Sequence, residues 1–463
     1  MKTTDFNPTL VQNYDQPGSD YASYPDLGQF HDGFDAAAYK QQVQASNDEL
    51  IPRSLAVLIH IPFCETLCYY CTCDREISEQ IEQTVPYMAA LHQEIELQAE
   101  LFDADRKVVR LHLGGGIPTY LTDPQLSKLM SRLAKHFNLP EKKKREWSIE
   151  VDPRTVNIQR IDLLAELGFN YLRLGVQDFD PQVQESVNRI HLPEHSAQLI
   201  NRARKQGFKC VSIDLTYGLP RQTPASFAAT IDKIIQLRPD RLSVYNYSNQ
   251  PQLLPSRQPI KHTDLPSPET KLEMLEESIK RLQQAEYRHI GLDQYALESD
   301  DLSRAQDKGK LQRNLQGYAT KAPHELLGLG VGAISQVANC YSQNHRSLAA
   351  YQATLKNHAL PISRGLILRD EDRLRRAIIQ QIMCQHKIEF AALSYKYHLD
   401  FNHHFAMEME LLEQLAVDGL VEIDALSLRV TPKGHFLLRP IARIFDQYSH
   451  QHESTQRVSR IHS

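Results

Sequence analysis

The feature that most constrains the fold of this chain is an alternation of short β-rich runs with longer helical stretches between residues 55 and 292. The predicted strands are 55–61, 108–113, 147–151, 171–176, 210–215, 241–245 and 289–292. The predicted helices between them are 85–101, 123–137, 160–167, 197–205, 226–237 and 267–285. Strands that alternate with helices form βα units with a parallel sheet. Six or seven such units fit a full or partial (β/α) barrel better than a small doubly wound sheet.

The flanking regions lack this alternation. The predicted segments are an N-terminal arm at 1–50, the barrel at 51–300, a connecting segment on the substrate side at 301–365 and a C-terminal domain at 366–463. The elements predicted in the C-terminal domain are helices at 373–385, 390–397 and 402–415, a hairpin at 420–423 and 427–430, and a final helix from Lys433. That order indicates a mostly helical, winged-helix-like domain.

Composition excludes several classes of protein. The chain of 463 residues has 52 Lys and Arg against 57 Asp and Glu, a formal net charge of −5. A nucleic-acid-binding protein usually carries a basic surplus, and Glu408, Glu410 and Glu413 would repel phosphates from the recognition helix of a winged helix. No apolar run is long enough to span a bilayer, and residues 1–10 lack the apolar core of a secretory signal. We therefore expect a cytoplasmic protein with no nucleic-acid or membrane partner, and we expect a monomer.

Four of the seven cysteines fall within ten residues, directly after the first predicted strand. Cys64, Cys68 and Cys71 have the spacing CxxxCxxC and can wrap one face of an iron–sulfur cubane, which Cys thiolates normally ligate. With three protein ligands, one iron keeps an open position. The alternative is structural zinc with Cys73 as the fourth ligand, although the second Cys pair of a zinc ribbon is absent. The remaining cysteines lie in apolar surroundings and are predicted to be inert core residues: Cys210, Cys340 and Cys384.

A second group of candidates lies at the carboxyl ends of the predicted strands. Gly114, Gly115 and Gly116 follow the second strand, where glycines either let a ligand approach the backbone or satisfy a turn with positive φ. The polar residues that end the next four strands are Glu150, Gln177 with Asp178, Asp214 and Ser248. Each alone is explained equally well as a helix cap or a structural hydrogen-bonding partner. Because active sites of barrels are built at this rim, their shared placement predicts an active site beside the cysteines.

Together these motifs resemble the radical S-adenosylmethionine (SAM) enzymes, and among them the oxygen-independent coproporphyrinogen III oxidases. The resemblance runs over nearly the whole chain. The matching motifs include Ser23-Tyr24-Pro25, His60-Ile61-Pro62-Phe63-Cys64, Gly114-Gly115-Gly116, Ser148-Ile149-Glu150-Val151-Asp152-Pro153, Gly175-Val176-Gln177-Asp178-Phe179 and Asn314-Leu315-Gln316-Gly317-Tyr318. The resemblance implies an α/β fold, a partial (β/α)6 radical SAM barrel with an N-terminal arm and a winged-helix-like C-terminal domain.

The resemblance also implies an activity in haem biosynthesis: two propionate side chains of coproporphyrinogen III are decarboxylated to vinyl groups through a 5′-deoxyadenosyl radical, giving protoporphyrinogen IX. Cys64, Cys68 and Cys71 would ligate a [4Fe-4S] cluster. The implied residues for a first SAM are Gly115, Gly116, Glu150 and Ile334. Those for a second SAM are Tyr70, Gln177, Arg189, Asp214 and Ser248. An unidentified reducing electron donor completes the expected partners.

Some positions differ from the family's usual residues, namely Asp20, Leu58, Thr72, Ile117, His191 and Gln294. One alternative is therefore a paralogue that keeps the cluster and SAM but acts on another tetrapyrrole or handles haem. Another is a non-enzymatic interaction protein with an iron–sulfur or zinc centre. Cys73 and the Ser23-Tyr24-Pro25 arm favour the oxidase over the paralogue. A non-enzymatic protein would have no function for the polar strand-end residues Glu150, Gln177 and Asp214.

Overall fold

The computed structural model describes residues 5–14, 19–72, 76–78, 80–248, 259–320 and 324–449. The chain divides into two compact units that interleave along the sequence. The sheet unit contains Phe30–Ala285 and Pro323–Ile367, and the helical unit contains Met1–Gln29, Glu286–Ala322 and Leu368–Ser463. The division into four consecutive segments stays a prediction. Within the part that the structure describes, no helix is both long and apolar enough to cross a bilayer.

The predicted strands between residues 55 and 245 form the centre of the sheet unit. They are β1 (Leu55–Ile61), β4 (Val108–Gly115), β5 (Glu146–Val151), β6 (Tyr171–Gln177), β7 (Cys210–Tyr217) and β8 (Arg241–Asn246). Each pairs in parallel with the next in the order β1-β4-β5-β6-β7-β8. Most residues of β1 are buried, whichever face of the sheet they point to, as in a strand covered on both sides. The predicted α/β class and parallel sheet are confirmed.

The other edge of β1 carries strands that the sequence did not indicate. β13 (Glu325–Leu329) pairs with β1 in parallel, and β14 (Ile334–Val337), β15 (Cys340–Asn344) and β16 (Ile362–Ile367) continue the sheet as an antiparallel meander. They lie in the region expected to be a connecting segment. The sheet unit therefore combines a parallel centre with an antiparallel extension.

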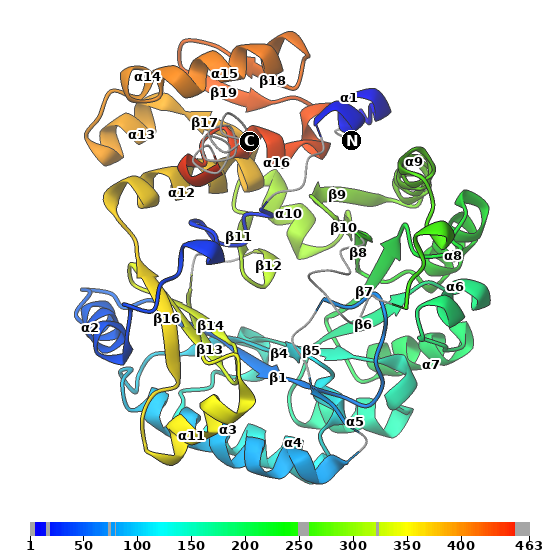
Figure 1. The fold of residues 1–463 in the computed structure, drawn as a ribbon, viewed down its shortest axis with the longest axis vertical. Coiled ribbons are helices and arrows are strands. Elements are labelled where there is room, and N and C mark those ends of the chain that lie inside the picture. The colour runs from blue at the N-terminus through cyan, green and yellow to red at the C-terminus, as the bar shows by residue number, and fades with distance from the viewer. Residues whose placement is uncertain are drawn as a thin grey trace, which may run out of the picture. The chain divides into compact units, whose positions relative to one another are not determined.

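The sheet unit has helices along the outer side of its curved parallel strands and one, at residues 36–47, against β14 and β15 (Figure 1). They are α2 (Ala36–Asn47), α3 (Thr84–Ala99), α4 (Asp123–His136), α5 (Ile158–Glu166), α6 (Pro181–Ser186), α7 (Pro193–Lys205), α8 (Pro224–Leu237), α9 (Pro268–Gln284) and α11 (Leu348–Lys356). Local signals fix their starts: Thr122 and Gln125 form a capping box on α4, which buries Leu126 and Leu133 on its sheet side. All six predicted helices are present.

The helical unit contains helices of 4 to 16 residues and short strands. Its helices are α1 (Pro8–Tyr14), α10 (Asp301–Asp307), α12 (Asp370–Gln385), α13 (Phe390–Tyr397), α14 (Phe401–His404), α15 (Ala406–Val417) and α16 (Leu438–Arg443). Its strands are β9 (Tyr287–Gly291), β10 (Gln294–Leu297), β11 (Gln312–Asn314), β12 (Gly317–Ala319), β17 (Lys387–Glu389), β18 (Val421–Ile423) and β19 (Ser427–Val430).

Three predictions about the helical unit need correction in detail. The strand predicted at 289–292 is β9, which pairs antiparallel with β10 and so does not begin a further parallel βα unit. The helix predicted at 402–415 is two helices, because the chain bends at Phe405. The final helix begins at Leu438, after a 3₁₀ turn at Gly434–Phe436. The predicted hairpin is confirmed as β18 and β19, and β17 completes a three-stranded sheet with β19 in the middle.

Candidate active site

A cavity of about 450 Å³ opens at the carboxyl ends of β4 to β8. Most of the residues predicted for the cluster and SAM line it: Cys64, Cys68, Tyr70, Cys71, Gly115, Gly116, Glu150, Gln177, Arg189 and Asp214. The predicted residues that do not line it are Ser248, which is exposed after β8, and Ile334 in β14. The strand ends thus converge as a barrel rim predicts.

The cysteine loop follows β1 directly. Its first cysteine lies in β2 (Phe63–Cys64), which pairs in parallel with β3 (Glu76–Ile77). Cys64 and Cys68 are buried and Cys71 is half-buried, and all three line the cavity. Phe63 stacks on Tyr120 at 5.9 Å between ring centroids and shields the loop from water. Three thiols around one cavity fit a cubane cluster with an open position better than a closed structural site.

Two cysteine predictions have different outcomes. Cys73, the fourth ligand of the zinc alternative, lies outside the described residues. Cys210, Cys340 and Cys384 are buried away from the cavity, as predicted. Burial raises the pKa of the Cys340 and Cys384 thiols to about 12, so both stay protonated and unreactive.

The glycine turn brings β4 against the cysteine loop. Gly115 has φ +107°, and a Cβ there would come within 1.7 Å of His60 Cδ2. A Cβ on Gly116 would lie 2.6 Å from the carbonyl oxygen of Phe63. The Gly116 amide donates to the Ile61 carbonyl at 2.7 Å. The positive φ that the turn explanation requires is present at Gly115, and Gly115 and Gly116 line the cavity, while approach of a ligand to their backbone stays a prediction.

A charged network connects the ends of β5, β6 and β7. Arg173 Nε donates to Asp214 Oδ2 at 2.7 Å, its Nη1 lies 3.5 Å from Glu150 Oε1, and its Nη2 donates to the Tyr245 hydroxyl at 2.6 Å. His112 Nε2 lies 3.4 Å from Glu150 Oε1 on the other side. Burial alone would raise the pKa of Glu150, but His112 and Arg173 outweigh it and hold this pKa at about 2. Glu150 is therefore a carboxylate at every physiological pH.

Gln177 and Asp178 are neighbours with different environments. Gln177 has φ +70° at an irregularity in the pairing of β6 with β7, and its side-chain oxygen accepts from Thr216 Oγ1 at 2.6 Å. The turn places Gln177 on the cavity wall. Asp178 is buried away from the cavity and accepts from Thr230 Oγ1 at 2.6 Å and Gln222 Nε2. Asp178 is thus a structural hydrogen-bonding residue, the simpler of the two explanations for a polar strand end.

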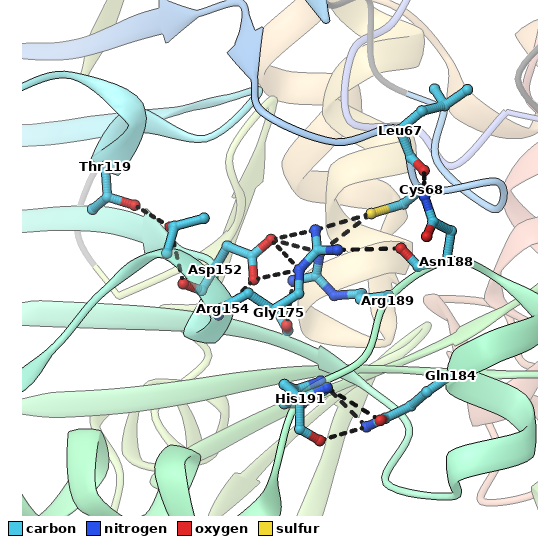
Figure 2. Close-up of polar contacts among 11 residues, drawn as sticks. Leu67, Cys68, Thr119, Asp152, Arg154, Gly175, Gln184, Asn188, Arg189 and His191 are labelled. Atoms are coloured by element: carbon cyan, nitrogen blue, oxygen red, sulfur yellow. Dashed lines mark hydrogen bonds and ion pairs between the residues drawn. The ribbon is translucent and has the colours of Figure 1, made fainter. Parts of the chain in front are cut away.

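Arg189 forms the cavity wall beside the cysteine loop. Its Nη1 lies 2.9 Å from Asp152 Oδ2, and its Nη2 donates to the Gly175 carbonyl at 2.5 Å (Figure 2). Burial alone would raise the pKa of Asp152, but Arg189 and Arg154 hold it at about 2. The carboxylate in turn keeps both guanidinium groups in place.

Sequence reasoning missed several residues of the wall. They are Asp152, Arg173, Thr216 and Tyr245. One signal was available: residues 171, 173, 175 and 177 alternate with buried residues along β6, so Arg173 shares the face of Gln177. Only the structure shows that Arg173 reaches both Glu150 and Asp214.

The departures from family-typical residues fall in several places. Thr72 and Ile117 line the cavity. His191 is buried, with Nδ1 3.2 Å from Gln184 Nε2, and burial lowers its pKa to about 4, so the ring is neutral at pH 7. In the helical unit, Asp20 Oδ2 lies 3.0 Å from Arg313 Nη2.

Comparisons with known proteins agree with this site. Residues 58–234 match the family model of the Radical SAM superfamily, and residues 368–437 match that of the HemN C-terminal domain. The chain is thus a radical SAM protein, a class that uses a [4Fe-4S] cluster and SAM.

Full-length relatives define the family more closely. The oxygen-independent coproporphyrinogen III oxidase of Pseudomonas aeruginosa is 42% identical over 461 residues, covering 100% of both chains, and that of Synechocystis is 38% identical, covering 99% of this chain and 98% of the relative. The solved coproporphyrinogen III oxidase (HemN) from Escherichia coli, described as a radical SAM enzyme, superposes with a TM-score of 0.91 at 41% identity, covering 97% of this chain and 100% of that chain. This chain belongs to the family of oxygen-independent coproporphyrinogen III oxidases.

Proposed function

We propose that this chain decarboxylates two propionate side chains of coproporphyrinogen III to vinyl groups without oxygen, giving protoporphyrinogen IX. The observation that carries the proposal is the single cavity in which three cysteines, a glycine turn and the carboxylates Glu150 and Asp214 meet. The full-length similarity to curated oxidases supports the substrate. When bound, the cluster and SAM would supply a 5′-deoxyadenosyl radical to remove a hydrogen atom from the propionate β-carbon, and the substrate radical would then lose carbon dioxide and pass one electron to an external acceptor.

Residues on the β1, β4 and β5 side would hold the cluster and the first SAM. Cys64, Cys68 and Cys71 would ligate three irons. The bare backbone of Gly115 and Gly116 allows close approach of the ligand, and the Glu150 carboxylate can accept hydrogen bonds from its amine or ribose. Ile334 stays a predicted contact from the resemblance alone.

Residues on the β6 and β7 side would hold a second SAM. Tyr70, Gln177, Arg189 and Asp214 share the cavity with the first site. Asp214 Oδ1 is buried and accepts no hydrogen bond from any described residue, so it can accept one from a ligand. Ser248 stays a predicted contact from the resemblance. The volume of about 450 Å³ lies within the range of roughly 300–1,000 Å³ that small-molecule sites show.

The proposal extends to partners and location. An external one-electron reductant would reduce the cluster, because each cleavage of SAM to methionine and a 5′-deoxyadenosyl radical consumes one electron. We propose a monomeric enzyme of the cytoplasm, where reducing conditions keep cluster thiols available, with no nucleic-acid or membrane partner.

An anaerobic product assay tests the function. The full chain is reconstituted with iron and sulfide, reduced, and supplied with SAM and coproporphyrinogen III. We expect 5′-deoxyadenosine, carbon dioxide and protoporphyrinogen IX. Release of 5′-deoxyadenosine without protoporphyrinogen IX would select the paralogue that acts on another tetrapyrrole. Absence of 5′-deoxyadenosine from cluster-loaded protein would contradict both.

A further inference from the structure

One cysteine of the loop, Cys68, has two arginines beside its sulfur. Arg154 Nη2 donates to Cys68 Sγ at 3.2 Å, and Arg189 Nη1 donates to the same sulfur at 3.5 Å (Figure 2). Both distances are within hydrogen-bonding range for sulfur. Arg189 lines the cavity, whereas Arg154 does not and reaches the site through Cys68. Arg154 therefore has a contact with the cysteine that substrate or SAM binding does not explain.

A buried carboxylate orders the two arginines. Asp152, which is 3% exposed, lies 2.7 Å from Arg154 Nη2 and 2.9 Å from Arg189 Nη1. A second anchor comes from the loop before α7: Arg154 Nη1 donates to the Asn188 carbonyl at 3.2 Å, and Asn188 Nδ2 donates to the Leu67 carbonyl at 2.8 Å. The guanidinium of Arg154 is thus fixed relative to Cys68 from two sides.

The charges around Cys68 do not cancel. Two guanidinium groups face one carboxylate, which leaves one positive charge next to the sulfur. N–H donors and positive charge near a ligating thiolate stabilise the reduced cluster, because reduction adds one negative charge that the sulfurs share. The effect is strong where water is excluded, as around the buried Cys68.

We propose that Arg154 is a positioning residue that raises the reduction potential of the cluster by donating to Cys68 Sγ, with Asp152 holding it there. The inference rests on the proposed function for the presence of the cluster but not for the identity of the substrate. It assigns to Arg154 a task in the one-electron reduction by the external reductant, in which the cluster gains one electron and no bond is broken.

A redox titration of the reconstituted full chain without SAM, followed by EPR of the reduced cluster, tests this inference. The variant Arg154→Ala is expected to lower the equilibrium constant for cluster reduction about tenfold, equal to about 59 mV for a one-electron couple. Arg154→Lys, which keeps the charge, is expected to restore most of the potential. An unchanged midpoint in Arg154→Ala at equal iron and sulfide content would overturn the proposal.

Controls separate tuning from loss of structure. Arg202→Ala removes an arginine that pairs with Asp162 at 2.5 Å on the surface of the same unit and is expected to leave the midpoint unchanged. An equal shift in that variant would also overturn the proposal. If Arg154→Ala assembles no cluster, Arg154→Gln decides: it keeps an N–H donor without the charge, and it must shift the midpoint in the same direction. If the unaltered chain forms no protoporphyrinogen IX, the proposed substrate is wrong. The midpoint potentials still test the role of Arg154, because they are measured without substrate.

Discussion

Two glutamates of the sheet unit, the partly exposed Glu150 and the fully buried Glu94, show how this chain treats charge inside and outside its cavity. Glu150 lines the cavity between His112 and Arg173. Glu94 in α3 is fully buried and accepts only from neutral donors: the Gly330 amide at 2.7 Å, Asn344 Nδ2 at 2.6 Å and the Tyr351 hydroxyl at 2.6 Å.

The same residue type thus has opposite titration behaviour in the two regions. Burial raises the pKa of Glu94 to about 7, and its hydrogen bonds offset this only in part. Glu150 stays at about 2 because its partners are cationic. In the cavity, then, the Glu150 carboxylate is kept ionised by cationic partners, whereas the carboxyl group of Glu94 in the interior is held by neutral donors. Substitutions at matched pairs of residues test this difference.

The largest expected effect is at a cluster ligand. Cys68→Ala removes one of three thiolates, so we expect 5′-deoxyadenosine release to fall to background, while Cys340→Ala leaves turnover within about twofold because that thiol is a buried core residue. Iron content and SAM cleavage under reducing conditions measure both. An active Cys68→Ala enzyme would refute the ligand assignment.

The next effect is at Glu150. Glu150→Gln keeps the shape but removes the charge, and a charge-assisted hydrogen bond contributes about 1.5–3 kcal/mol. We therefore expect SAM to bind about 10- to 100-fold more weakly, measured by equilibrium dialysis of the cluster-loaded chain. Glu146→Gln, at the far end of the same strand and paired with Arg110 at 3.2 Å, is the matched control and should leave SAM binding unchanged. Equal affinities for the two variants would remove Glu150 from the SAM site.

The parallel centre of the fold was predictable because its strands are short β-rich runs, nearly continuous in β1 and alternating in β5 and β6, separated by helices with clear periodicity. The extension was not. β14 has only Ile334–Val337, and its register depends on pairing with β13 and β15, which no local pattern encodes. The bend at Phe405 was equally hidden, because the chain is helical on both sides of it and neither Pro nor Gly marks the break.

The candidate site divides in the same way. Cysteine spacing, glycines and polar strand ends indicated which residues share the rim, and most of them do. The sequence did not show which polar residue at a strand end lines the cavity. Gln177 and Asp178 are adjacent, and the positive φ that distinguishes Gln177 is visible only in the structure. The partners of Cys68 and Glu150 come from strands and loops distant in sequence, so Arg154 and Arg173 required the structure.

A smaller effect is expected at Arg173. The single ammonium group of a lysine cannot contact Asp214, Glu150 and Tyr245 at once, as the planar guanidinium group does. Arg173→Lys should therefore lower kcat/KM for SAM cleavage about tenfold. Arg202→Lys is the control for a surface arginine. If Arg173→Lys and Arg202→Lys have the same kcat/KM for SAM cleavage, the charged network between the ends of β5 and β7 does not contribute to that reaction.

The smallest effect on activity is expected at Glu94, where the informative readout is stability against pH. The folded pKa of about 7 lies above the ordinary value of 4.5, so between these values the folded chain keeps a proton that the unfolded chain has released. The contribution of Glu94 to the free energy of unfolding is fully present below pH 4.5 and is lost as pH rises through 7, by up to about 3 kcal/mol at 1.36 kcal/mol per pKa unit.

Glu94→Gln cannot titrate. Urea unfolding at several pH values should therefore show the unfolding free energy of the unaltered chain falling relative to that of Glu94→Gln from about pH 5 to pH 8. The corresponding difference for Glu150→Gln should stay flat over that range, because the depressed pKa of Glu150 affects stability only below about pH 4.5. Parallel profiles for Glu94→Gln and the unaltered chain would mean that the interior carboxyl is ionised like the one in the cavity.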